Sequence, residues 1–230
     1  AWIIFTGLFA RLILIPSSPI LEDDFYRYFW DGAVTANEYN PYVFSPQEVI
    51  DKNPEVPKQI LKLSEESGEV INKIKYPKIR TLYPALSQII FAFSYYLYPW
   101  SLTGWKLILL VGDIFLLFFI FRILRELKLP YSFAAIYWLN PIVLHEFFNS
   151  AHYDLFTLLF VAVSIYYYLK DEHLVSMVTL SFAVGFKLWP ILLLPLFLRK
   201  YFNRKIKLAA NLAVFGLFLI IIFIPVLRAG

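Results

Sequence analysis

The sequence predicts an all-α protein, a polytopic bundle of transmembrane helices with short helices in one large outer loop. Hydrophobic residues make up 60% of the chain, and the mean hydropathy is +0.63. Soluble domains are only about 45–50% apolar, so the composition indicates an integral membrane protein. Most charged residues lie between Glu22 and Arg80, and the remainder of the chain consists of apolar runs with short charged joints.

The apolar runs are the expected membrane spans, since a helix needs about 20 residues to cross the hydrocarbon core. In chain order they cover residues 2–15, 82–98, 105–124, 131–148, 155–169, 174–186 continuing to 198, and 208–227. Asp113 lies inside the third run, where a charge is expensive unless it faces other helices or a polar cavity. Pro141, Pro190 and Pro195 interrupt their runs, which indicates kinks or cavity walls where freed carbonyl groups find partners.

The first outer loop, residues 16–81, is the large polar segment of the chain. Within it, Ser45, Pro46 and Glu48 match the start of a helix with a capping box. Residues 57–64 and 69–74 predict two further short helices. The chain begins inside one apolar run and stops just after another, so we expect residues 1–230 to be a single membrane domain and a piece of a longer protein.

The basic joints indicate the orientation, because Lys and Arg are enriched in cytoplasmic loops. Residues 198–207 form the most basic joint, and Arg122 and Arg125 mark a second one. The outer loop and residues 145–154 then face the non-cytoplasmic side of a multi-pass protein, which we expect in a cell inner membrane. Two full crossings after the outer loop would return Arg122 to the outside. Either residues 82–98 do not cross, or the Arg122 joint departs from the charge rule.

The stretch at residues 22–32 carries the densest group of reactive side chains. Besides five aromatic residues, it contains the charged residues Glu22, Asp23, Asp24, Arg27 and Asp31. Adjacent carboxylates raise one another's cost of ionisation unless a substrate, a cation or a base lies between them. We interpret this stretch as a catalytic loop on the membrane surface. The alternative is an amphipathic anchor whose acids are incidental.

The joint at residues 145–154 is the second polar cluster. A zincin motif requires two His four residues apart on one helix face, and His145 and His152 are seven apart, so this motif is excluded. A looser metal site built from His145, His152 and Asp154 is one alternative. The other is a polar joint at a cavity mouth, where Asn149, His152 and Asp154 bind sugar hydroxyls through their donors and acceptors.

Cations near the bilayer boundary are candidate phosphate ligands. Lys187 lies between two apolar runs just before Pro190, where a helix break lets a cation meet a phosphate. Arg80 precedes the second apolar run, and Arg gives bidentate phosphate contacts whereas Lys gives a point charge. Arg11, inside the first run, is a third candidate. The alternative for each is an interfacial anchor whose long side chain reaches the surface.

Acids in a loop and cations at the bilayer boundary suit one substrate class, a sugar carried on a lipid phosphate. A loop carboxylate would deprotonate an acceptor hydroxyl, and the cations would stabilise charge that develops on the leaving phosphate. We therefore attribute the net charge of +4 to topology and phosphate binding, with no nucleic-acid partner. The absence of Cys excludes thiolate chemistry.

The order of the polar motifs resembles the GT-C superfamily of glycosyltransferases. Within it, the chain is most similar to multi-spanning mannosyltransferases that use polyprenyl-phosphate sugars. These include prokaryotic α-mannosyltransferases and the catalytic subunit of the first mannosyltransferase of GPI-anchor synthesis. The resemblance is carried by residues 23–32, Asn40-Pro41-Tyr42, Tyr83-Pro84, Leu139-Asn140-Pro141, residues 149–154 and Phe186-Lys187-Leu188-Trp189-Pro190.

The resemblance implies a GT-C-like helix bundle and an inverting transfer of a hexose, mannose in the most similar relatives, on the non-cytoplasmic face. An acid of the first outer loop is the general base in that family. Eukaryotic relatives space these acids as Asp-x-Asp, whereas Asp23 and Asp24 are adjacent here; counted from Asp31, Asp23 takes the first position. We therefore expect Asp23 to be the base and Asp24 its partner, and leave open whether a divalent cation takes part.

The expected substrate-binding residues are Arg27, Asp31, Arg80, Tyr83, Asn149, His152, Asp154 and Lys187. Asp31 is expected to act mainly through structure, by holding Arg27. The expected partners are a polyprenyl-phosphate sugar donor, a glycan or lipid acceptor, and membrane lipids. The alternative function is a multi-spanning transporter or lipid flippase, because broken helices and buried charges occur there too. Convergence of the loop acids, Arg80 and Lys187 on one cavity would favour the enzyme.

Overall fold

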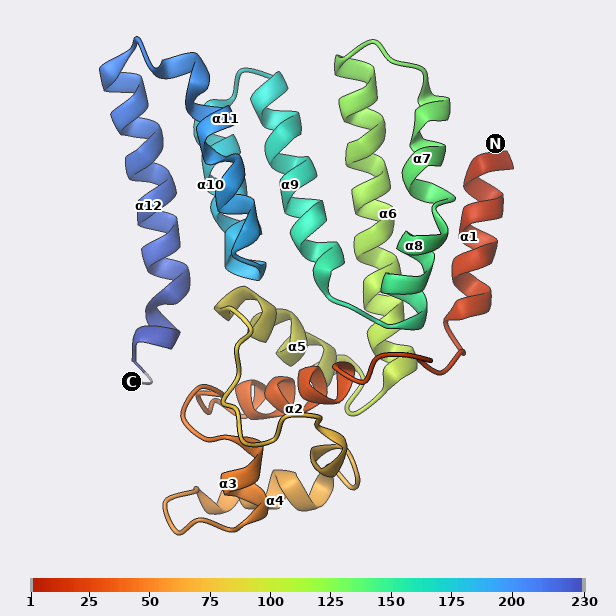
Figure 1. The fold of residues 1–230 in the computed structure, drawn as a ribbon, viewed down its shortest axis with the longest axis vertical. Helices are drawn as coiled ribbons and strands as arrows, with labels where there is room; N and C mark the ends of the chain where they lie inside the picture. The colour runs from red at the N-terminus through yellow and green to blue at the C-terminus, as the bar shows by residue number, and fades with distance from the viewer. Residues whose placement is uncertain (1, 229–230) are drawn as a thin grey trace.

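The computed structural model describes residues 2–228, and within that range the chain forms helices and no strands. Upright helices stand side by side above a layer of helices that covers their lower ends (Figure 1). The upright set comprises α1 (Trp2–Leu14), α6 (Leu102–Glu126), α7 (Ala135–Trp138), α8 (Pro141–Leu144), α9 (Asp154–Leu169), α10 (His173–Phe186), α11 (Leu194–Leu198) and α12 (Lys205–Leu227). The lower layer comprises α2 (Phe25–Ala36), α3 (Pro46–Ile50), α4 (Lys58–Glu66) and α5 (Ala85–Leu97). The predicted all-α class is confirmed for the described residues.

The outer surface of the upright helices is apolar. Helices α6 and α12 are long and apolar enough to cross a membrane, and α1, α9 and α10 are shorter apolar helices. Phe115 on α6 is 56% exposed and Ile220 on α12 is 63% exposed. Exposed apolar surface of this kind marks contact with a membrane or another protein. Crossing of the bilayer by every upright helix stays a prediction, because two helices of the described chain have the length of a span.

Helix α5 does not stand with the other apolar helices. Its position bears on whether residues 82–98 cross the membrane, which the sequence left open. Residues 82–98 were one candidate span, but α5 has 13 residues and lies against α2 in the lower layer (Figure 1). Its buried face includes the polar Ser87 and Gln88. Gly32 permits the close packing of the two helices, since a Cβ there would lie 2.4 Å from the Phe91 carbonyl oxygen.

Basic joints gather at the upper ends of the upright helices. Helix α6 reaches that end with Arg122 and Arg125, and the joint between α11 and α12 at the same end carries Arg199, Lys200 and Arg204 (Figure 1). The lower layer lies at the opposite end. With α5 outside the upright set, both basic joints lie at one end of the upright helices, which is the arrangement that the charge rule predicts for a multi-pass protein.

A buried ion pair joins α1 to α6 inside the upright set. Arg11 donates from Nε to Asp113, and both side chains are fully buried. Tyr137 donates its hydroxyl hydrogen to the same carboxylate. The guanidinium carbon of Arg11 lies 3.5 Å from the centre of the Trp138 ring. Asp113 thus faces neighbouring helices, as expected at that depth, and Arg11 is its structural partner rather than a phosphate ligand.

Within the outer loop, the predicted capping box is present at the start of α3. The Ser45 N–H donates to Glu48 Oε2 at 2.7 Å, and the Glu48 N–H donates to Ser45 Oγ at 3.3 Å. Helix α4 matches the second predicted helix, but the third is a single turn, η1 (Ile71–Lys73). The buried side chains that pack these elements on α2 are Trp30, Val34, Val49, Val56, Ile60, Leu63, Ile71 and Ile74.

Candidate active site

The loop that carries the predicted acids joins α1 to α2 and is held in place by α6. Lys106, near the start of α6, is fully buried. Its Nζ donates to the carbonyl oxygens of Leu14 at 3.1 Å and Ser17 at 2.7 Å. These carbonyls lie at the C-terminal end of α1, where a cation is favoured. The conformation of the acid loop therefore depends on a residue far along the chain.

Asn149, one of the predicted sugar-binding residues, contacts the same loop. Its Nδ2 donates to the Ser18 carbonyl oxygen at 3.1 Å, and its Oδ1 accepts from the Ile20 N–H at 3.2 Å. Asn149 is 5% exposed and ends η3 (His145–Asn149), a π-helical turn. Backbone groups of the loop occupy both ends of the amide, so Asn149 positions the loop, and its role in sugar binding stays a prediction.

Glu22, Asp23 and Asp24 follow one another at the end of this loop. Asp24 occupies the N-cap of α2, but its side chain makes no capping hydrogen bond. In the described part of the chain, no Lys or Arg nitrogen lies within 4.0 Å of these three carboxylates. Asp23 Oδ1 is buried and has no hydrogen-bond partner within that range. The loop thus presents three acids that no basic side chain neutralises directly.

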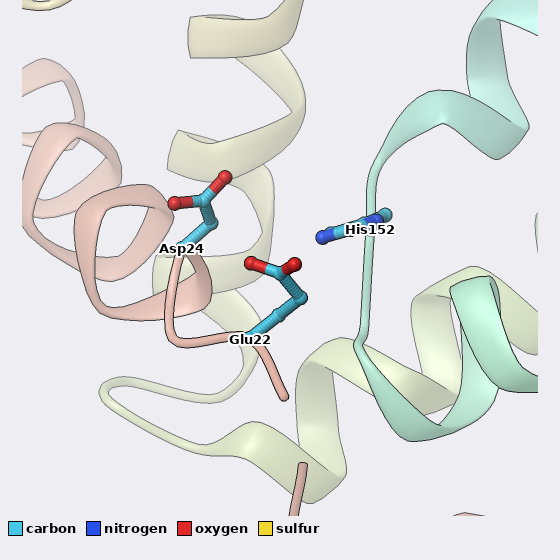
Figure 2. A group of neighbouring side chains, drawn as sticks. All are labelled: Glu22, Asp24 and His152. Atoms are coloured by element: carbon cyan, nitrogen blue, oxygen red, sulfur yellow. The ribbon is translucent and has the colours of Figure 1, made fainter. Parts of the chain in front are cut away.

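His152 forms a cluster with two of these acids (Figure 2). One potential ligand atom from each of Glu22, Asp24 and His152 lies within 4.8 Å of the others. The ring of His152 is oriented by Glu146, whose Oε2 lies 2.8 Å from Nδ1. Two carboxylates and one imidazole are a donor set that can hold a divalent cation.

The two aspartates line a cavity of about 120 Å³ that also contains cations of the outer loop. Its charged and tyrosine lining includes Asp23, Asp24, Arg27, Lys75, Tyr76, Arg80 and Tyr83. Arg80 is exposed, and its Nη2 lies 4.0 Å from Glu48 Oε1, so its guanidinium is accessible to an anion. The structure therefore brings the two acids together with Arg27, Arg80 and Tyr83 from the predicted substrate-binding set.

Arg27 is held at this cavity by Asp31, one helical turn further along α2. Arg27 Nε donates to Asp31 Oδ1 at 2.7 Å, and its Nη1 donates to the Ile79 carbonyl oxygen at 2.9 Å. Burial raises the pKa of the Asp31 carboxyl, and the charge and hydrogen bond of Arg27 oppose that rise. Arg27 Nη2 is buried without a partner in the described chain, so Arg27 keeps a donor for a ligand.

Asp23 also lines a second cavity, of about 490 Å³. The walls of this cavity carry the aromatic rings of Tyr26, Phe29 and Trp100, together with Glu22. Aromatic surface beside a polar group suits a ligand such as a sugar, which has apolar faces and hydroxyl groups. Asp23 lines both cavities, so this residue lies between them.

Three tyrosines pack beside the acids. The rings of Tyr28, Tyr83 and Tyr153 lie edge to face with centres 5.2–5.4 Å apart. Burial raises the pKa of each phenol, and the charge of Asp24 is among the smaller causes of the rise. Their hydroxyl groups therefore stay protonated at neutral pH and are available as hydrogen-bond donors.

Lys187 and Asp154 form an ion pair at the lower ends of α10 and α9 (Figure 1). Lys187 Nζ lies 5.5 Å from the centre of the Tyr153 ring, but Lys187 does not line the cavity that contains Arg80. Of the two cations that were expected to converge on one cavity, Arg80 lines the cavity and Lys187 does not. Among the described residues, His145, His152 and Asp154 do not form a group whose potential ligand atoms lie within 4.8 Å of one another, whereas Glu22, Asp24 and His152 do.

Sequence reasoning missed three residues of this region. Glu146 directly follows His145 in the excluded zincin pattern and lies six residues before His152. This proximity in the sequence was the one sign that Glu146 could contact His152. Lys75 and Lys106 look like ordinary charges in the sequence, and the fold alone brings them to the cavity and to the acid loop.

A family model described as the alpha-(1->6)-mannopyranosyltransferase N-terminal domain matches residues 82–202, just over half of the chain. No curated protein and no solved structure matches the chain. The matched range includes His152, Asp154 and Lys187 but begins after the acid loop. The roles of Asp23 and Asp24 therefore rest on the geometry of the site.

Proposed function

Because the chain belongs to the alpha-(1->6)-mannopyranosyltransferase N-terminal domain family, we propose that it transfers mannose from a polyprenyl-phosphate donor to a hydroxyl of a glycan or lipid acceptor. Family membership supports a glycosyltransferase that transfers mannose. The lipid-linked donor, the GT-C type of the fold and the inverting course of the reaction are our extension of it.

The observation that carries this proposal is the position of Asp23 between two unlike cavities. The smaller cavity has cationic walls suited to a phosphate, and the larger one has aromatic walls suited to a sugar acceptor. A carboxylate at their boundary is within reach of both reactants. Asp23 Oδ1 is buried and has no hydrogen-bond partner in the described chain, so no protein group competes with an acceptor hydroxyl for it.

The reaction is a single displacement at the anomeric carbon. The acceptor hydroxyl oxygen attacks that carbon from the face opposite the phosphate, and Asp23 takes the hydroxyl proton. The bond between the anomeric carbon and the phosphate oxygen breaks, and the electron pair leaves with the polyprenyl phosphate. Arg27, Lys75 and Arg80 stabilise the charge on this leaving group. One displacement inverts the anomeric configuration.

The donor chain is assigned to an apolar groove of about 630 Å³ between α5, α10 and α12. Its apolar lining includes Leu86, Ile89, Phe182, Phe218, Ile221, Ile222 and Ile224. A hydrogen bond links the groove to the catalytic cavity: Tyr42 lines the groove and donates its hydroxyl hydrogen at 2.6 Å to the carbonyl oxygen of Tyr83, which lines the cavity. A lipid in the groove would therefore hold its phosphate near the catalytic acids.

The same proposal assigns the lower layer to the non-cytoplasmic face of a multi-pass protein in a cell inner membrane. The basic joints at the opposite end support this orientation. A transporter or lipid flippase is the less favoured function. The charges inside the upright set that would suggest transport, Arg11 and Asp113, neutralise each other and are fully buried.

The test is transfer of labelled mannose from a polyprenyl-phosphate donor to a mannose-terminated acceptor by the full chain in detergent or liposomes. Transfer by the parent protein, lost in an Asp23→Asn, Asp24→Asn double variant that still folds, is the expected result. Equal transfer by the parent and the double variant would overturn the mechanism. Donor movement across liposomes without any transfer would favour the flippase.

A further inference from the structure

Glu22, Asp24 and His152 come from segments about 130 residues apart and surround a common space (Figure 2). Their potential ligand atoms lie within 4.8 Å of one another, yet neither carboxylate lies within 4.0 Å of a His152 nitrogen. The imidazole is therefore close to both acids without pairing with them. Oxygen ligands lie about 2.0–2.6 Å from a divalent ion, so ligands on opposite sides of one ion are separated by about 4–5 Å.

The orientation of His152 is an independent sign of ligand binding. Glu146 Oε2 lies 2.8 Å from His152 Nδ1; in the tautomer that donates the Nδ1 hydrogen to this carboxylate, Nε2 is the acceptor nitrogen. A ring nitrogen of His152 points toward Glu22 and Asp24 in Figure 2. A carboxylate behind a histidine in this way is the usual support of a metal-binding imidazole.

The charge balance around the cluster points the same way. Asp31 is paired with Arg27, and Asp154 is paired with Lys187. Glu22 and Asp24 have no Lys or Arg nitrogen within 4.0 Å in the described part of the chain. Carboxylates this close together repel each other when both are charged, unless a cation lies between them. No Lys or Arg of the described chain supplies this charge by direct contact with Glu22 or Asp24, which leaves the space between them open to a bound cation.

We infer that Glu22, Asp24 and His152 bind one divalent metal ion of the Mn²⁺ class, with Glu146 as the positioning residue of His152. Carboxylate ligands favour Mg²⁺, Ca²⁺ and Mn²⁺, and imidazole favours later transition metals. Mn²⁺ accepts both ligand types and retains open positions for water or phosphate oxygen. Binding of the ion stands on the geometry alone. Its role, holding a donor phosphate oxygen beside Asp23, rests on the proposed function.

The experiment measures binding of Mn²⁺ itself to the full chain, purified in detergent and stripped of metal with a chelator. Bound Mn²⁺ is counted by the loss of the free-ion signal in electron paramagnetic resonance. We expect one ion per chain in the parent protein, and at least about tenfold weaker binding in Asp24→Asn and in His152→Ala. Glu146→Gln should weaken binding by about 10–100-fold, as loss of a supporting group does at other metal sites.

His145→Ala is the matched control, because His145 also contacts Glu146, at 3.3 Å, but lies outside the cluster. Its Mn²⁺ affinity should equal that of the parent. Failure of the parent chain to bind Mn²⁺, or equal binding by a folded Asp24→Asn, His152→Ala double variant, would overturn the inference. Binding in a protein without mannosyl transfer would keep the metal site and remove the proposed function. Mannosyl transfer that survives chelation, in a protein that binds no Mn²⁺, would remove the metal site and keep the proposed function.

Discussion

Arg27 and Asp31 form a buried ion pair one helical turn apart on α2, with Nε 2.7 Å from Oδ1 and Asp31 only 1% exposed. Asp31→Asn removes the charge that compensates Arg27 and leaves a buried guanidinium without a counter-ion. Such a change costs about 3–5 kcal/mol of unfolding free energy. Denaturation of the detergent-solubilised protein measures this loss.

The matched control for that variant is Glu66→Gln, which breaks another pair of the same spacing, between Lys62 and Glu66 at 3.5 Å. Both of these side chains are exposed, so the expected change is at most about 1 kcal/mol. An equal loss of unfolding free energy in the two variants would show that burial of the Arg27–Asp31 pair does not determine its contribution to stability.

The second prediction separates the base from its neighbour. Asp23→Asn removes the proton acceptor, so kcat should fall about 10²–10⁴-fold, or roughly 3–5 kcal/mol of barrier, with donor binding retained. Asp24→Asn should lose less, and excess Mn²⁺ should restore part of its activity, because Asp24 is assigned to the ion. Rescue of Asp23→Asn by Mn²⁺, without rescue of Asp24→Asn, would instead make Asp24 the base and Asp23 the ligand of the ion.

The third prediction concerns donor phosphate. Arg80→Ala should weaken binding of the polyprenyl-phosphate donor at least about tenfold, because hydrogen bonds to charged groups contribute about 1.5–3 kcal/mol. Lys78→Ala is the control, since Lys78 is exposed and absent from the lining of the cavity. Lys187→Ala should have a smaller effect than Arg80→Ala, because Lys187 is paired with Asp154. Equilibrium binding of a labelled donor measures all three.

The fourth prediction tests the apolar groove. Ile221→Trp places a larger side chain in the groove and should raise KM for long-chain donors more than for short-chain ones. Ile220→Trp on the same helix is the control, because Ile220 is 63% exposed and lies outside the groove lining. Identical KM values for the two variants would argue that the donor chain lies elsewhere.

The fifth prediction is a dependence of stability on pH. Hydrogen bonds from the backbone N–H and the hydroxyl of Ser45 lower the pKa of Glu48. Its contribution to stability is therefore complete above the unfolded pKa of about 4.3 and is lost as pH falls through the lower folded value. The difference in Tm between the parent and Glu48→Gln should be constant near pH 7 and shrink below about pH 4. Glu65→Gln, an exposed acid outside the capping box, should show no such trend.

Much of the fold could be predicted from local chemistry. The apolar runs predicted helices because a backbone surrounded by apolar side chains must satisfy its own hydrogen bonds. The capping box at Ser45 depends on residues three positions apart, so it was visible in the sequence and is present in the structure. The acid stretch at residues 22–24 was likewise apparent as a dense group of charges beside an apolar run.

The sequence by itself determined the helical class, the acid loop and the helix start at Ser45, because each depends on neighbours along the chain. Tertiary structure alone decided that α5 lies flat on α2, where it buries Ser87 and Gln88, since an apolar run has the same composition in either place. It also decided that Asn149 holds the acid loop and that His152 lies close to Glu22 and Asp24. These contacts join residues about 130 positions apart, and packing between helices, which no local pattern encodes, brings them together.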